Sequence, residues 1–276
     1  MIITMHGLST MHCNIRTDIR IADETGYDGL EIVESKLLRY LNQGLKAEDL
    51  LPIFARHAVR PVCINALKSI ERIEPAERQA LLAEAERLCA AAEVLGCPTI
   101  QLVPFCGLEG RPWREVLRLT ARNIADIADI GMRHGVRFQL EPIAWSPIHS
   151  LSQSLQVIQE AERDNVGMVI DFWHLWAGEE TTPDEVAKLD SSQIYGVHFC
   201  DGIRHTKGSE WVEEDLRGYL PEEGDIPVAE WVSAVRSTGF DGVWSSELLS
   251  PKHWEWDLWE IARETKVRME RYLAGK

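Results

Sequence analysis

Short apolar runs alternate along this chain with longer segments in which apolar residues recur at helical spacing. The short runs predict strands, because a brief continuous apolar run fits a strand that is buried on both faces. They cover residues 2–7, 29–34, 60–65, 99–104, 137–142, 167–171, 194–199 and 242–248. The longer segments predict helices, and the clearest of these cover residues 75–95, 112–134, 151–163, 183–189, 227–238 and 255–273.

Strands that alternate with helices indicate βαβ units and a parallel sheet. Eight such units in 276 residues predict an α/β protein with one closed (β/α)₈ TIM barrel as a single domain over residues 1–276. The rival architecture, a doubly wound open sheet, is disfavoured because its G-x-G-x-x-G turn is absent from the sequence. The similar segments TGYDG at 25–29 and TGFDG at 238–242 are a weak sign of a repeated unit.

Composition and charge narrow the classes of partner. With 29 basic and 44 acidic residues the net charge is −15, which argues against a nucleic-acid partner because phosphate binding needs clustered Lys and Arg. No apolar stretch is long enough to span a membrane, and the first residues do not resemble a signal peptide. We therefore expect a cytoplasmic protein with reduced thiols at its six scattered cysteines, at positions 13, 63, 89, 97, 106 and 200.

Four residues that carry chemistry lie near the carboxyl ends of four successive predicted strands: Glu141, Asp171, His198 and Glu247. In a parallel barrel this end gathers the loops that form the active site. Three carboxylates in one place repel one another, and a divalent cation relieves that repulsion. Oxygen ligands with one nitrogen suit Mn²⁺ or Mg²⁺, and Co²⁺ or Zn²⁺ also fits. Isolated polar residues are the alternative, but Glu and Asp seldom follow apolar runs without a partner.

Two further residues lie close to this set along the chain. His174 follows Asp171 by three positions, and Arg204 follows His198 by six. Either side chain is placed to bind a substrate oxygen beside the metal. Simpler roles stay open for both, since His174 can cap a helix and Arg204 can form a salt bridge in a loop.

At these residues the sequence resembles the xylose isomerase-like barrel superfamily of sugar isomerases and epimerases. The specific segments are LEP at 140–142, IDFWH at 170–174, VHFCDGIR at 197–204 and SSEL at 245–248. The resemblance implies a metal held by the four residues above, with Glu141 and Glu247 also serving as acid and base. It also implies that His174 and Arg204 bind substrate oxygens.

The sequence departs from particular members of that superfamily. Where ketose 3-epimerases carry a sugar-binding glutamate after the fifth strand, this chain has Pro147. Where 3-dehydroshikimate dehydratases carry a histidine, it has Ile143. The additional ligands that endonuclease IV needs for three metals are not visible in residues 200–226. These departures weigh against a free ketohexose, against dehydroshikimate and against DNA as substrates.

The site residues therefore predict a metal-dependent isomerase or epimerase of a small keto-sugar or keto-inositol, with one divalent ion, of which Mn²⁺ is favoured. Proton removal next to a carbonyl gives an enediolate that a cation stabilises. The same intermediate allows dehydration, so a lyase acting on a keto-polyol stays open, as does a sugar-binding barrel without catalysis. The absence of a Gly-rich phosphate cradle disfavours phosphorylated substrates, whereas a carboxylated one would be bound by Arg204 and Arg217.

Ten tryptophans are an unusual number for this length. Trp145 lies four residues after Glu141, and we expect its indole face to form a wall of a sugar pocket. Trp113, Trp231 and Trp259 fall in helical segments and are expected to pack in the core. The apolar positions within 254–262 suggest a contact between copies of the chain in a homo-oligomer.

Overall fold

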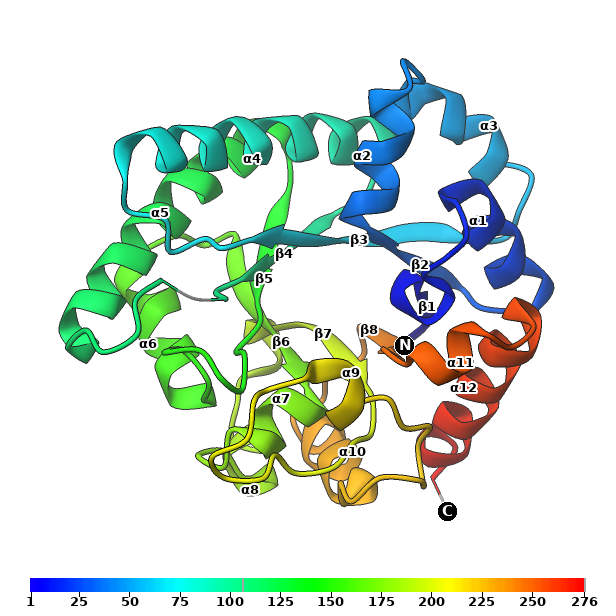
Figure 1. The fold of residues 1–276 in the computed structure, drawn as a ribbon. Helices are drawn as coiled ribbons and strands as arrows, with labels where there is room; N and C mark the ends of the chain where they lie inside the picture. The colour runs from blue at the N-terminus through cyan, green and yellow to red at the C-terminus, as the bar shows by residue number, and fades with distance from the viewer. Residues whose placement is uncertain (106, 276) are drawn as a thin grey trace.

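In the computed structural model of this chain, which describes residues 1–105 and 107–275, the strands form a closed parallel barrel (Figure 1). Each strand pairs with the next, and β8 pairs with β1 to close the ring. The strands are β1 (Ile2–His6), β2 (Gly29–Val33), β3 (Arg60–Lys68), β4 (Thr99–Val103), β5 (Arg137–Leu140), β6 (Val166–Asp171), β7 (Ile194–Phe199) and β8 (Val243–Ser246). The predicted TIM barrel is therefore confirmed, and each strand overlaps its predicted range.

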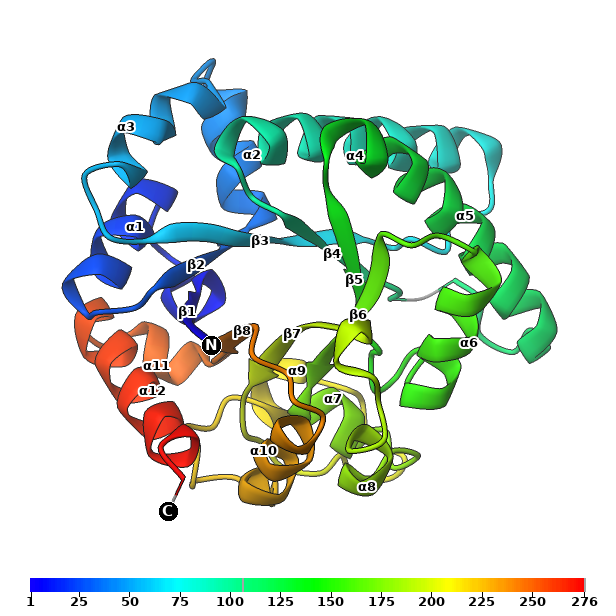
Figure 2. The same cartoon turned by 180° about the vertical axis from the view of Figure 1, so that it is seen from behind.

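Helices surround the barrel on the outside, as the views from both sides show (Figures 1 and 2). They are α1 (Ile15–Glu24), α2 (Glu34–Asn42), α3 (Leu51–Phe54), α4 (Pro75–Leu95), α5 (Trp113–His134), α6 (Leu151–Ala161), α7 (Phe172–Ala177), α8 (Pro183–Val186), α9 (Glu213–Leu216), α10 (Val228–Ser237), α11 (Pro251–Trp254) and α12 (Leu258–Leu273). Short 3₁₀ turns occupy Gly7–Thr10, Ala47–Leu50 and Ser191–Gln193. Within the described residues, no helix is both long and apolar enough to cross a membrane.

Local chemistry sets the helix ends. Helix α4 begins at Pro75, whose missing N–H costs nothing in a first turn. Helices α4 and α5 end at Gly96 and Gly135, where φ is 65° and 66°, a left-handed conformation that glycine adopts without strain. Ser150 and Gln153 form a capping box at the start of α6. These caps explain why the ends of the long helices were predicted closely.

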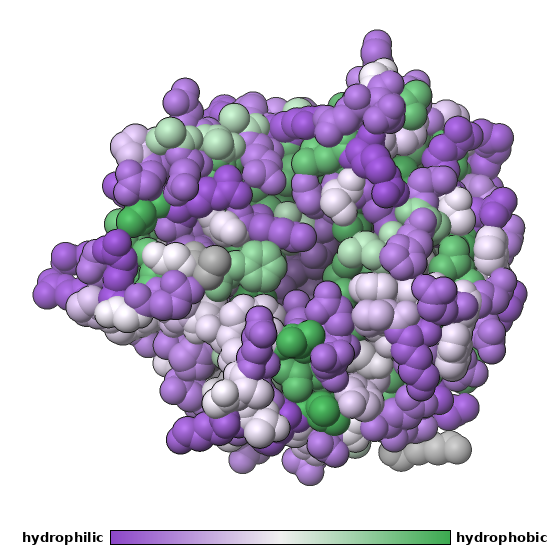
Figure 3. All heavy atoms as spheres, viewed as in Figure 1, coloured by the Kyte–Doolittle hydropathy of each residue, from purple (hydrophilic) through white to green (hydrophobic). Residues whose placement is uncertain are grey.

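The core lies between the outer face of the barrel and the helices. Trp231 and Trp244 are fully buried there, and Trp113 and Trp259 pack against it while half-buried. The described cysteines are free thiols, as expected, and Cys106 lies outside the described residues. Seen from the side of Figure 1, the surface has a hollow near its centre with hydrophilic residues in its depth (Figure 3). The strands thus carry their polar side chains to one open end.

Candidate metal centre

Every strand of the described barrel contributes a polar, buried side chain, three of them from within the strand and the others at or next to its carboxyl end. These residues are at most 8% exposed, and in strand order they are His6, Glu31, Asn65, Gln101, Glu141, Asp171, His198 and Glu247. The register explains their convergence, since His6 is paired with Glu31 and Asp171 with His198 across neighbouring strands. Paired residues of a parallel sheet point to the same face, which here is the barrel interior.

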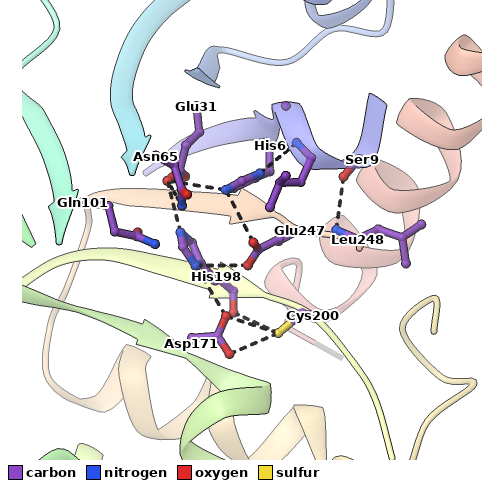
Figure 4. Close-up of polar contacts among 12 residues, drawn as sticks. His6, Ser9, Glu31, Asn65, Gln101, Asp171, His198, Cys200, Glu247 and Leu248 are labelled. Carbon is purple, nitrogen blue, oxygen red and sulfur yellow. Dashed lines mark hydrogen bonds and ion pairs between the residues drawn. The ribbon is translucent and has the colours of Figure 1, made fainter. Parts of the chain in front are cut away.

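The four residues singled out from the sequence meet around one imidazole nitrogen. Figure 4 shows three of them, Asp171, His198 and Glu247. Nδ1 of His198 lies 2.9 Å from Glu141 Oε1, 3.1 Å from Glu247 Oε2 and 3.4 Å from Asp171 Oδ2. One atom from each of the four lies within 4.8 Å of all the others. Three carboxylates and one imidazole in a space this small make a donor set that fits a divalent cation.

Arg217 brings a positive charge into this centre from the long segment between β7 and α10. Its Nη2 donates to Asp171 Oδ2 at 2.8 Å and to Glu247 Oε2 at 2.6 Å. Its Nη1 donates to Glu213 Oε1 at 2.9 Å, and the side chain is 2% exposed. Arg217 therefore offsets part of the negative charge that the carboxylates concentrate.

His174 lies beside Arg217 on the first turn of α7. Asp171 caps that helix, because its Oδ1 accepts the backbone N–H of His174 at 2.7 Å. Nδ1 of His174 accepts the backbone N–H of Ala144, and its Nε2 lies 3.0 Å from Arg217 Nη1. Burial lowers the pKa of His174 to about 3, and the Arg217 charge acts in the same direction. His174 is thus a neutral side chain at the edge of the carboxylate cluster.

The structure does not bring Arg204 to the four clustered residues. Its guanidinium stacks over the ring of Trp176 at 4.1 Å, and Nη1 pairs with Glu179 at 3.2 Å. The Arg204 side chain is 46% exposed. The arginine that reaches the cluster, Arg217, comes nineteen residues after His198 rather than six. Spacing along the chain gave no sign of this, because the long segment folds back on itself.

Trp145 stands in a group of aromatic rings next to His174. Its ring centroid lies 5.4 Å from that of His174, 5.7 Å from Trp211 and 6.2 Å from Trp173. Trp211 in turn stacks on His205, with centroids 3.9 Å apart. Trp145 and Trp211 are half-buried, so these two indoles keep exposed surface near the cluster.

Reasoning from the sequence missed the polar residues of the first four strands. Gln101 Nε2 donates to Glu141 Oε2 at 2.8 Å, and Asn65 Nδ2 donates to Glu31 Oε1 at 3.3 Å. Glu31 Oε1 also lies 3.2 Å from His198 Nε2. A signal was present, because each of these residues interrupts an otherwise apolar strand. It was weak, since one amide or one acid in a strand has many structural explanations.

Opposed pKa shifts follow from the crowding of these charges. Burial raises the pKa of Glu141 to about 8, although the contact with His198 acts against it. Burial alone would also raise the pKa of Glu247, but Arg217, His198 and His6 outweigh it and hold the value well below its usual range. His198 is shifted upward despite burial, because Glu247 and Glu31 favour its charged form and so raise its pKa. Without a metal, the cluster therefore retains protons near neutral pH.

The family described as the xylose isomerase-like TIM barrel matches residues 19–268. This chain belongs to that family. An inosose isomerase from Halalkalibacterium halodurans is 25% identical over 256 residues, which span 92% of this chain and 89% of that protein. A crystal structure of the IolI protein with a bound zinc atom has a TM-score of 0.91 at 22% identity, covering 99% of this chain and 98% of that one.

A sugar epimerase of the same fold is also similar to this chain. The structure of D-psicose 3-epimerase with D-tagatose from Clostridium cellulolyticum H10 has a TM-score of 0.78 at 14% identity and covers 99% of both chains. At such identities the likeness shows the fold alone. Together these findings describe a xylose isomerase-like barrel with a buried cluster of acidic and histidine residues, whose distant relatives include inosose isomerases.

Proposed function

We propose that this protein is a metal-dependent isomerase or epimerase of a small, uncharged keto-polyol, of which an inosose is the first candidate. The observation that carries the proposal is that Glu141 and Glu247, from different strands, both lie within 3.1 Å of His198 Nδ1. Two carboxylates beside one candidate metal position are suited to remove a proton from one side of a carbon and to return it from another.

Glu141, Asp171, His198 and Glu247 would hold the metal. Mn²⁺ is favoured by the oxygen-rich donor set, and Zn²⁺, which the IolI crystal structure contains, is an alternative together with Mg²⁺ and Co²⁺. A bound divalent ion would supply positive charge next to the carbonyl oxygen of the substrate, which makes the neighbouring C–H more acidic.

The residues of the chain carry the proton and the substrate. In this proposal one of Glu141 and Glu247 takes the proton from the carbon next to the carbonyl, and the other returns a proton. Return to the same carbon epimerises it, and return to the neighbouring carbon moves the carbonyl group. Arg217 lies against Glu247, and the neutral His174 lies against Arg217. Both are placed to bind substrate oxygens, whereas Arg204 would act only at the outer rim.

The charges around the centre favour an uncharged substrate. Arg217 is already paired with three carboxylates, and Arg204 with Glu179. An anionic substrate would have to approach several buried carboxylates, and these two arginines are already committed to carboxylates of the chain. The half-buried face of Trp145 suits instead the C–H face of a polyol ring. This is why we place inososes before sugar phosphates and sugar acids.

Hydrogen exchange in D₂O tests the proposal directly. The purified protein is stripped of metal, reloaded separately with Mn²⁺, Mg²⁺, Co²⁺ or Zn²⁺, and incubated with inososes and uncharged ketohexoses. We expect metal-dependent incorporation of deuterium next to the carbonyl, together with an isomeric product by NMR. A product that absorbs in the ultraviolet with loss of water would identify a dehydratase. Ligand binding without exchange for any substrate would identify a binding protein.

A further inference from the structure

A second group of buried residues lies against the inner side of His198. Glu31 Oε1 is 3.2 Å from His198 Nε2 and 3.6 Å from His6 Nε2, and the two imidazole rings meet edge to face with centroids 5.3 Å apart (Figure 4). Glu31 and His198 are each 1% exposed, and His6 is fully buried. One atom from each of these three residues lies within 4.8 Å of the others, so the group is either a second metal site or a support for the first.

Hydrogen bonding decides the role of His6 in this group. The backbone N–H of Leu8 donates to Nδ1 of His6 at 3.1 Å, so Nδ1 carries a lone pair. A neutral imidazole has one N–H, which must then be on Nε2. A protonated Nε2 cannot bind a metal, and this nitrogen faces Glu31 and Glu247, with each carboxylate oxygen 3.6 Å away. The Nε2–H of His6 therefore faces these two carboxylates from beyond hydrogen-bond distance, and His6 is not a metal ligand.

The same reasoning applies to His198. Its Nδ1 faces the carboxylates of Glu141, Asp171 and Glu247, whereas its Nε2 faces only Glu31 in these contacts. To bind a metal together with those three carboxylates, Nδ1 must have a free lone pair, and the proton must stay on Nε2. A carboxylate that accepts the Nε2 proton is the group that holds a histidine in this tautomer.

We propose that Glu31 is a positioning residue that accepts the Nε2 proton of His198 and so keeps Nδ1 available to the metal. Asn65 donates to the same oxygen at 3.3 Å and holds Glu31 in place, and the Nε2–H of His6 faces that oxygen from 3.6 Å. The barrel then binds one metal ion per chain, and the group around Glu31 takes none. This inference rests on the metal centre of the proposed function but not on any particular substrate.

The experiment compares Glu31→Leu, which removes the acceptor, with Glu31→Gln, which retains an acceptor oxygen without the charge. Zn²⁺ affinity is measured by competition with a chelator, bound zinc by elemental analysis, and the tautomer of His198 by long-range ¹⁵N–¹H NMR at a Zn²⁺ concentration that just saturates the wild type. Glu34→Gln, a half-buried glutamate three residues further along the chain, is the matched control. Thermal melting of the metal-free proteins verifies that each variant is folded.

We expect one zinc per chain in the wild type, with the proton of His198 on Nε2. Glu31→Leu should weaken Zn²⁺ binding by about 10- to 100-fold, as loss of an outer hydrogen-bond partner does elsewhere. At a Zn²⁺ concentration that saturates the wild type, the Nε2–H signal should be lost from the metal-free fraction of this variant. Glu31→Gln should retain the Nε2–H signal, with a Zn²⁺ affinity between those of the wild type and Glu31→Leu. The control variant should match the wild type. If Glu31→Leu does not fold, the affinity and tautomer of Glu31→Gln decide.

Three results would overturn the inference. Two zinc ions per wild-type chain, one of them lost in both Glu31 variants, would make the second group a metal site. An unchanged tautomer and unchanged affinity in both Glu31 variants would make Glu31 merely structural. If both Glu31 variants lose the same affinity and keep the tautomer of His198, Glu31 acts only through its negative charge. Absence of isomerase activity despite tight Zn²⁺ binding would instead count against the proposed function and leave the role of Glu31 intact.

Discussion

Arg217 Nη2 lies 2.6 Å from Glu247 Oε2 at the centre of the barrel, although a loop and a short helix separate Arg217 from the strands. The same nitrogen donates to Asp171, so one guanidinium group bridges two carboxylates that we assign to the metal. The cluster therefore has a built-in positive charge before any cation binds. This relationship makes the stability of the metal-free protein depend on Arg217.

Replacement of Arg217 by methionine should destabilise the metal-free protein by about 3–5 kcal/mol, because it leaves buried carboxylates without their partner. Addition of Mn²⁺ should raise the melting temperature of this variant by more than that of the wild type, since the ion replaces the lost positive charge. Thermal melts with and without Mn²⁺ measure both effects. Arg204→Met is the control, because its exposed ion pair with Glu179 contributes about 0–1 kcal/mol. Equal melting temperatures of metal-free Arg217→Met and Arg204→Met would show that Arg217 does not stabilise the metal-free protein.

Glu247→Gln should lower the rate of deuterium exchange into the substrate by at least about 10²- to 10⁴-fold, the usual contribution of a positioned acid or base. The amide is the same size as the carboxylate, so the melting temperature at saturating metal should change little. Glu141→Gln is expected to behave in the same way, and Glu179→Gln, on the exposed rim, to retain exchange. A Glu247→Gln protein that binds metal and exchanges at the wild-type rate would remove Glu247 from the mechanism.

The barrel could be predicted from the sequence because its strands are short apolar runs between well-capped helices. Half of the polar ring was predictable for a related reason: Asp171 and Glu247 each follow an apolar run, where an unpaired acid is unusual. Glu31 could not be interpreted in this way, because it lies inside a strand and its meaning depends on the register with β1 and β3. Arg217 was harder still, since its position depends on how residues 200–226 fold back over the barrel.

The affinity for metal should increase with pH up to about 8. In the metal-free protein burial raises the pKa of Glu141 to about 8, so a proton occupies this carboxyl below that pH and competes with the ion. The raised pKa of His198 acts in the same direction, because protonation of Nδ1 removes a ligand. For each proton that the metal ion displaces from the protein, the association constant of the ion increases about tenfold per pH unit. Chelator competition at pH 6, 7 and 8 measures the slope, and an affinity independent of pH would show that neither group is a ligand.

Asp201 fixes the segment that carries Arg217, and its replacement should lower activity from a distance. Its buried carboxylate accepts four backbone N–H groups of the long segment, from Gly202 at 2.8 Å, Glu222 at 3.0 Å, Gly224 at 3.1 Å and Ile226 at 3.2 Å. The fit is tight, since a Cβ atom at residue 224 would lie 2.3 Å from the Asp201 oxygen. The segment that carries Arg217 is thereby tied to the end of β7.

In Asp201→Asn one of the two acceptor oxygens becomes an NH₂ group that faces backbone donors, and a hydrogen bond to a charged group contributes about 1.5–3 kcal/mol. Amide hydrogen exchange over residues 202–226 should therefore accelerate, and kcat should fall at least about tenfold as Arg217 loses its fixed position. Zn²⁺ affinity should change less, because the four proposed ligands come from the strand ends. Asp225→Asn, an exposed acid in the same segment, is the matched control. Wild-type exchange and kcat in Asp201→Asn would show that Arg217 is held by its carboxylate partners alone.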